Sequence, residues 1–128
     1  MIHFDSDYMA GALPEIMQRL IDTNLEETSG YGTDEYTRRA KELIKTACGN
    51  DNSQVYFLVG GTQTNKTVID TLLERYEGVM AADTGHINVH ESGAIENSGH
   101  KVIALPSYEG KVKAEDVDSY LTSFFADE

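Results

Sequence analysis

The sequence predicts an α/β fold, in which a parallel β-sheet carries helices on both faces. After residue 50, short β-branched and aromatic runs alternate with amphipathic helical segments, and this alternation favours crossover connections between parallel strands. The run at 54–59 begins with Gln54 and continues without polar alternate positions, as is typical of a strand buried on both faces. The length of 128 residues suits one domain with a core of its own.

The N-terminal region is predicted to form an arm followed by a helix. Residues 1–12 show no periodicity, whereas 13–25 carries apolar residues on one helical face. Pro14 suits the first turn of this helix because its missing N–H would have no intrahelical partner there. We expect residues 1–30 to form one part of the chain, and 31–128 to form an α/β block.

A second helix is predicted to begin at an N-cap, Thr33 or Asp34, and to run to about Cys48. Gly49 is its expected stop, because glycine adopts the left-handed conformation that ends many helices. Cys48 is the one cysteine of the chain, so it has no internal disulfide partner. It falls on the apolar stripe of this helix, and we expect it to be buried rather than reactive.

The remaining elements follow the α/β pattern. Strands are predicted at 54–59, 79–83 and 101–105, and each is followed by a helical segment or a turn that leads into one. The closing helix places four apolar residues on one face, namely Val117, Tyr120, Leu121 and Phe124. No internal repeat is present.

The charge balance excludes several classes of partner. The chain has 22 acidic and 10 basic residues, a net charge of -12. Divided after Thr64, the halves carry 10 acids with 5 bases and 12 acids with 5 bases, so both are acidic. Nucleic acid and anionic membrane surfaces require clustered Lys and Arg, and we therefore expect neither as a partner. No apolar run spans a bilayer and the N-terminus has no signal pattern, so we expect a cytoplasmic protein.

A glycine-rich turn follows the first predicted strand. Gly60, Gly61 and Thr62 lead directly into a helix, and in parallel sheets ligands bind at the carboxyl ends of the strands. Glycines allow close approach to the backbone, and the N–H groups of a first helical turn attract anions, which makes this a candidate phosphate site. The alternative is a tight turn that needs glycine for its geometry alone.

The second predicted strand also ends in polar residues. His86 and His90 are four residues apart and Glu91 is adjacent, so a helix here could offer two imidazoles to a metal ion, although no third ligand is evident and we expect no metal. His86 could instead stack on a planar ligand or act as an acid or base. In the third alternative, His86 and Glu91 only cap and anchor a helix.

Four motifs in this order resemble the low-specificity threonine aldolases, which belong to the beta-eliminating lyases of aminotransferase-like fold. The resemblance covers the whole chain. The motifs are Ser6-Asp7, Tyr31-Gly32-Thr33-Asp34, Gly60-Gly61-Thr62-Gln63-Thr64-Asn65, and Ala82-Asp83-Thr84-Gly85-His86-Ile87 with Glu91.

The resemblance implies an enzyme that uses pyridoxal 5'-phosphate to cleave L-threonine or L-allo-threonine to glycine and acetaldehyde. It implies that 31–128 is the first block of the large domain of such an enzyme, and that the enzyme is a homodimer or homotetramer. Gly60, Gly61 and Thr62 match the turn that binds the cofactor phosphate. His86 matches the histidine that stacks on the pyridine ring and assists proton transfer.

The resemblance also assigns substrate contacts. Ser6 matches a serine that contacts the substrate carboxylate, and Tyr31 lies in a loop that reaches toward the active site in these enzymes. Asn65 and Glu91 have an expected structural or supporting role. His90 departs from the family pattern, in which an aromatic such as Tyr or Phe is common.

The lysine that binds the cofactor covalently has no counterpart here. Four lysines follow the glycine turn, namely Lys66, Lys101, Lys111 and Lys113, and none lies in the family's lysine context. We therefore expect the N-terminal part of such an enzyme, inactive on its own. The alternative function is a self-standing α/β module that binds phosphate or a nucleotide.

Overall fold

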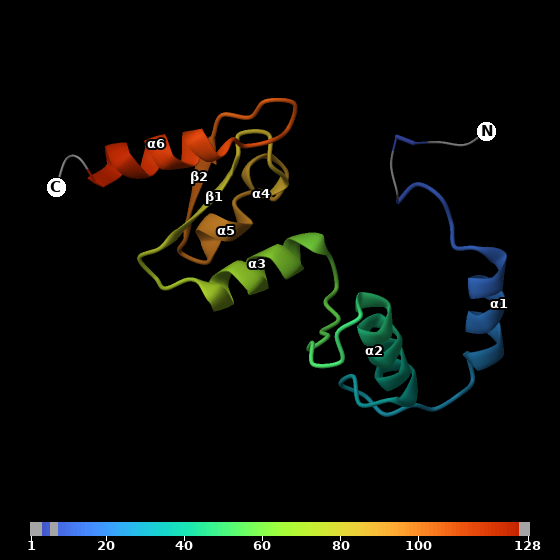
Figure 1. Ribbon diagram of the computed structural model, residues 1–128. Helices are drawn as coiled ribbons and strands as arrows, with labels where there is room; N and C mark the ends of the chain where they lie inside the picture. The colour runs from blue at the N-terminus through green and yellow to red at the C-terminus, as the bar shows by residue number, and fades with distance from the viewer. Residues whose placement is uncertain (1–3, 6–7, 126–128) are drawn as a thin grey trace. The chain divides into compact units, whose positions relative to one another are not determined.

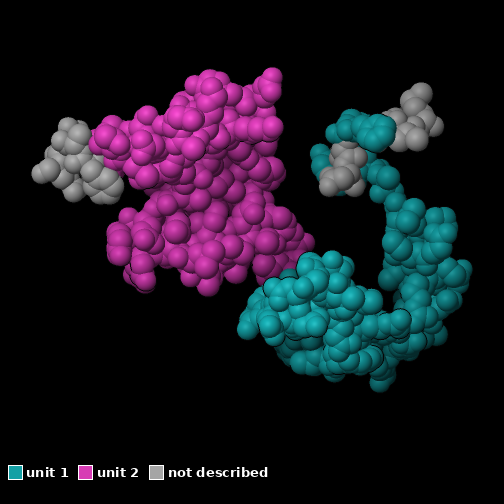
Figure 2. Space-filling view, in the orientation of Figure 1, with its two compact units in different colours: residues 1–56 teal, residues 57–128 magenta. Residues whose placement is uncertain are grey.

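The computed structural model describes residues 4–5 and 8–125, which fall into two compact units. Figure 2 shows the first unit, Met1–Tyr56, and the second unit, Phe57–Glu128, in different colours. The predicted division after residue 30 concerns a different boundary and stays a prediction. No helix in the described ranges has the length and apolarity needed to cross a membrane.

The first unit contains the two helices predicted for it, α1 (Pro14–Thr23) and α2 (Glu35–Cys48). Pro14 opens α1, as expected. The carboxylate of Asp34 caps α2 by accepting a hydrogen bond from the backbone N–H of Thr37 at 2.8 Å. Gly49 ends α2 with a left-handed φ of 63°. Local capping signals in the sequence therefore locate both ends of α2.

Neither helix of the first unit buries a residue. The predicted burial of Cys48 is wrong, because its side chain is exposed. Helix α2 does have an apolar stripe, but no described side chain covers it at this position. The apolar face of α1 is exposed in the same way, over Leu13, Ile16, Met17, Leu20 and Ile21.

The second unit confirms the α/β class. Its elements in chain order are α3 (Gly61–Leu72), β1 (Gly78–Ala82), α4 (His86–Val89), α5 (Ala94–Asn97), β2 (Lys101–Leu105) and α6 (Ala114–Phe125). Figure 1 shows β1 and β2 side by side. They pair in parallel, with Gly78 opposite Lys101 at one end and Ala82 opposite Leu105 at the other.

Helices cover both faces of this small sheet, as predicted. Met80 and Ile103 are register partners, and they line a pocket together with residues of α6. The next residue of β1, Ala81, lies against Gly85 at the start of α4. Since successive side chains of a strand point to opposite faces, α6 and α4 lie on opposite sides of the sheet.

The predicted strand at 54–59 is wrong. These residues form no strand, since β1 and β2 pair only with each other among the described residues. The backbone N–H of Val59 is bound by the side-chain oxygen of Gln63 at 2.8 Å instead of by a neighbouring strand. The apolar side chains from Tyr56 to Val59 are all exposed. Residues 54–59 therefore have the composition of a buried strand, but no strand among the described residues pairs with them.

The core of the second unit is small and half polar. Among the described residues, only Ile95 and Leu105 are buried apolar side chains, and Glu91 and His100 are the buried polar ones. Both ring nitrogens of His100 have partners: Nδ1 lies 3.1 Å from the carbonyl oxygen of Glu77, and Nε2 lies 3.2 Å from a carboxylate oxygen of Asp70. This histidine therefore links the loop before β2 to α3 and to the loop before β1.

Candidate functional site

The carboxyl end of β1 positions His86. The backbone N–H of Asp83 donates to the carbonyl of Leu105 at 2.8 Å, which extends the strand pairing by one residue. The N–H of Gly85 then donates to the carbonyl of Ala82 at 2.8 Å and turns the chain into α4. His86 is the first residue of that helix. It therefore stands at the sheet edge where ligands bind in α/β folds.

A hydrogen-bonded triad joins His86 to α3. The Oε1 atom of Glu91 lies 2.8 Å from Nδ1 of His86 and 2.5 Å from Nδ2 of Asn65. Asn65 belongs to α3, four residues after its first residue, so the start of α3 and His86 share a common anchor. We call Asn65, His86 and Glu91 the anchor triad.

Two members of the anchor triad, His86 and Glu91, differ in exposure. The side chain of His86 is 63% exposed, whereas that of Glu91 is 0% exposed. The histidine ring is thus available to a ligand, and the carboxylate lies beneath it. The rings of His86 and His90 lie 5.5 Å apart at an angle of 53°. In the described part of the chain, no group of three His, Cys, Asp or Glu side chains is arranged to hold a metal ion.

The backbone after Glu91 explains how this residue folds back under α4. Ser92 and Gly93 have positive φ values of 52° and 72°, and two successive left-handed residues reverse the chain direction. Ile95, two residues later, is fully buried and fixes the start of α5 in the core. The reversal and the buried side chain together place Glu91 between α4 and α3.

The glycine turn forms the uncapped start of α3. Gly60 is the N-cap residue and no side chain caps the helix. Its φ of -169° is extended backbone that any residue adopts, and Gly61 has no positive φ. A Cβ atom added to either glycine would meet nothing within 4 Å. Neither backbone conformation nor crowding therefore requires glycine, which argues against the purely geometric interpretation of this turn.

These features fit the phosphate of pyridoxal phosphate. The first N–H groups of a helix have no intrahelical partner and point toward an anion, and α3 has 12 residues to supply a helix dipole. The missing side chains at Gly60 and Gly61 leave the backbone accessible. Thr62 is exposed in the same turn and offers a hydroxyl group. The exposed ring of His86 is suited to contact with a planar ligand.

The other predicted site residues are placed differently. Ser6 lies outside the described residues. Tyr31 lies in the first unit, between α1 and α2, where its side chain is fully exposed and its φ is 60°. Lys66, in α3, donates from Nζ to the side-chain oxygen of Asn97 at 2.9 Å.

Sequence reasoning missed one residue at the sheet edge. Ser107 is the second residue after β2, and its hydroxyl donates at 2.5 Å to Oδ1 of Asp83, the first residue after β1. The hydroxyl oxygen of Thr84 lies 3.1 Å from that of Ser107. The position of Ser107 shortly after a parallel strand was the sequence signal that could have identified it.

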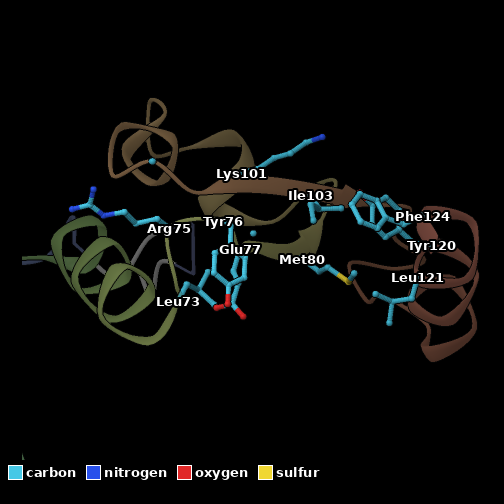
Figure 3. A pocket seen from close by; sticks show the side chains of 12 residues that line it. Leu73, Arg75, Tyr76, Glu77, Met80, Lys101, Ile103, Tyr120, Leu121 and Phe124 are labelled. Carbon is cyan, nitrogen blue, oxygen red and sulfur yellow. The ribbon is translucent and has the colours of Figure 1, made fainter. Parts of the chain in front are cut away.

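A cavity of about 520 Å³ lies away from these residues (Figure 3). It lies against the face of the sheet that carries Met80 and Ile103, and Tyr120 and Phe124 of α6 line it as well. It includes Gly78 and Lys101, the first residues of the two strands, so it extends to the end of the sheet opposite to His86. This cavity is therefore not the candidate site.

Comparison with known proteins identifies the family of the chain. The family model for beta-eliminating lyases matches residues 3–127. Low specificity L-threonine aldolase of Pseudomonas aeruginosa is 30% identical over 115 residues, which is 85% of this chain and 32% of that protein. Mitochondrial cysteine desulfurase of Drosophila melanogaster is 28% identical over 100 residues, which is 73% of this chain and 22% of that protein.

A solved structure of threonine aldolase from Leishmania major matches the fold with a TM-score of 0.88 at 37% sequence identity. The match covers 92% of this chain and 34% of that one. The chain thus spans about a third of the length of the aldolases that it matches. Because the family model covers nearly the whole chain, the chain belongs to the beta-eliminating lyase family.

Proposed function

We propose that this chain provides the cofactor-binding region of a pyridoxal-phosphate-dependent threonine aldolase. The observation that carries the proposal is the uncapped start of α3, whose two glycines the fold itself does not require. The relatives named as threonine aldolases support the choice of activity. The substrate is then a β-hydroxy amino acid such as L-threonine or L-allo-threonine.

Each residue has a distinct role in this proposal. The backbone N–H groups after Gly60 and Gly61, with the hydroxyl of Thr62, bind the cofactor phosphate. His86 contacts the pyridine ring and moves a proton on the substrate side. Ser6 and Tyr31 contact the substrate. When bound, pyridoxal phosphate supplies the electron sink for cleavage of the carbon–carbon bond.

The proposal extends to the setting of the enzyme. We place it in the cytoplasm, as a homodimer or homotetramer, with 31–128 as the first block of its large domain. The exposed apolar face of α1 supports self-association, because apolar patches of this kind favour contact with another protein surface.

We expect the 128-residue chain to bind the cofactor without covalent attachment and to show no turnover with L-allo-threonine. The side chain of Lys66 is bonded to Asn97, and Lys113 lies over the ring of Tyr108 at 3.8 Å. Lys101 lines the cavity on the other side of the sheet from α4. None of these three lysines is part of the anchor triad or of the glycine turn.

Titration with pyridoxal phosphate, followed by the induced circular dichroism of the bound chromophore, tests the proposal. Pyridoxal without phosphate is the comparison ligand, because reaction with surface lysines does not require the phosphate. We expect specific binding of the phosphate form only, and weakening by at least about tenfold in Gly61→Val, since about 1.4 kcal/mol corresponds to tenfold.

Gly30→Val is the matched control, because Gly30 also has open space around its added Cβ but lies in the first unit. Equal binding of both pyridoxal forms, or no effect of Gly61→Val, would contradict the proposed phosphate site. Tight binding of nucleotides in preference to pyridoxal phosphate would favour the alternative phosphate- or nucleotide-binding module.

A further inference from the structure

We infer that Glu91 is a positioning residue that sets the protonation of the His86 ring. In this arrangement Nδ1 of His86 always carries a proton, and Nε2 is the ring nitrogen that exchanges a proton with a ligand. The inference deepens the proposed role of His86 and rests on it only for the identity of the ligand. The ring protonation itself is a property of the chain alone.

The direction of the hydrogen bond follows from the partners of one oxygen atom. Oε1 of Glu91 receives the amide N–H of Asn65 at 2.5 Å and faces Nδ1 of His86 at 2.8 Å. The reverse orientation of the Asn65 amide would bring its oxygen against the carboxylate, which is repulsive. An oxygen that already accepts one hydrogen bond and carries negative charge favours a second donor, so Nδ1 carries the hydrogen.

The burial of the Glu91 carboxylate strengthens the assignment of the hydrogen to Nδ1 of His86. The Glu91 side chain is completely buried, and its second oxygen, Oε2, has no hydrogen-bond partner among the described residues. The hydrogen bonds that the described residues make to this buried carboxylate therefore all reach Oε1. Loss of the Nδ1–H donor would leave the carboxylate with Asn65 alone, and an undersatisfied buried charge is costly.

The other ring nitrogen, Nε2, is available to a ligand. No described group bonds to Nε2 of His86, and the side chain is mostly exposed. Glu91 itself is covered, so it acts through His86 and not on a ligand. Ser92 and Gly93, which directly follow Glu91, have positive φ values and turn the chain there. This arrangement holds one ring nitrogen, Nδ1, against a buried partner and leaves the other, Nε2, available for reaction.

Nitrogen NMR of the histidine rings in the whole 128-residue chain tests the inference. The spectra are recorded without cofactor at a pH where the imidazoles are neutral, and they distinguish Nδ1–H from Nε2–H. We expect His86 to be mainly Nδ1–H, opposite to the preference of free histidine. In Glu91→Ala, we expect His86 to revert to mainly Nε2–H.

Glu91→Gln is the conservative variant, because its side-chain oxygen can still accept from both Asn65 and His86. We expect it to keep the Nδ1–H form and so to separate loss of an acceptor from loss of folding. His90 in the same spectra is the internal comparison, and Glu96→Ala, an exposed glutamate of α5, is the matched control. Glu96→Ala should leave the protonation of the His86 ring unchanged.

The inference is overturned if His86 is mainly Nε2–H in the unaltered chain, or if Glu91→Ala leaves it as Nδ1–H with the fold intact. Chemical shifts of the Ile95 methyl groups report whether the core persists in each variant. Failure of pyridoxal phosphate to bind would refute the proposed function and leave this result unaffected, because no cofactor is present in the measurement.

Discussion

The first and second units differ in what holds their helices. In the first unit, α1 and α2 have no buried residues, and their ends coincide with local signals such as Pro14, Asp34 and Gly49. In the second unit, short helices of four residues, α4 and α5, are held by strand contacts, by the buried side chain of Ile95 and by the anchor triad. Isolated helices of that length are unstable in water, so tertiary contacts stabilise them.

This difference shows where chemistry can be organised in the chain. Tyr31, in the loop before α2, is fully exposed, and no side-chain hydrogen bond within the described residues holds it. His86 is placed by the end of β1, by Asn65 of α3 and by the reversal after Glu91. Reactive groups need such support from several elements to hold a productive geometry.

Removal of the buried side chain of Ile95 should have the largest effect on stability. Ile95→Ala is expected to lower the free energy of unfolding of the second unit by about 2–5 kcal/mol, because it leaves a cavity in a small core. Hydrogen exchange measured by mass spectrometry would show lost protection in 57–125 and unchanged protection in α2.

Ile21→Ala is the matched control in the first unit, because the same atoms are removed from a side chain that is 65% exposed. We expect a change within about 0.5 kcal/mol. An equal cost for the two substitutions would show that the α1 face is covered in solution, and the contrast between the units would then be wrong.

Two glycines of the second unit should respond oppositely to alanine. A Cβ on Gly78 would lie 2.8 Å from the carbonyl oxygen of Lys101, so Gly78→Ala must displace β1 or β2 and should cost about 1–3 kcal/mol. Gly61→Ala meets no atom and should stabilise α3 by about 0.4–1 kcal/mol through lower entropy of the unfolded chain. Urea denaturation of both variants measures the difference.

The opposite response of Gly61 is informative for function. If Gly61→Ala destabilises the chain, the turn needs glycine for its own geometry and the phosphate interpretation loses its main support. If it stabilises the chain, the glycine serves something other than the fold.

The smallest effect is expected at the cap of α2. Hydrogen bonds from the hydroxyl and the backbone N–H of Thr37 lower the pKa of Asp34 below its ordinary value. The cap therefore contributes stability above pH 3.8, and this contribution is lost as the pH falls through the lowered pKa. Circular dichroism should show a small loss of helix in Asp34→Ala at neutral pH, and no further loss from this group in acid.

Asp51→Ala is the control, an exposed aspartate beyond the end of α2. The hydrogen-exchange protection of the second unit should be identical in the unaltered chain and in both variants. A change there would contradict the view that the helices of the first unit are set locally.

Sequence patterns predicted the elements that depend on nearby residues. Gly49 was identified, and Asp34 was one of two predicted N-cap residues, because a cap acts within one helical turn. The strands at 78–82 and 101–105 were found within one residue, since their composition suits burial. Prediction failed at 54–59 and at Cys48, where the pattern indicates a buried surface but not the partner that would bury it.

The candidate site was predicted in part. The turn at Gly60 and the histidine at position 86 were recognised from their places after predicted strands, and Asn65 and Glu91 were expected only to support them. The link between α3 and α4 could not be derived, because it depends on the left-handed residues Ser92 and Gly93, whose conformation no local pattern specified.

The sequence by itself determined the α/β class, the helix ends and the acidic charge, because these depend on composition and on neighbours a few residues apart. Tertiary structure decided which side chains are buried, that Glu91 accepts from both Asn65 and His86, and that the Gly60 turn is open around its missing side chains. Such contacts join residues up to 26 positions apart, and their energies depend on a burial that only the assembled chain creates.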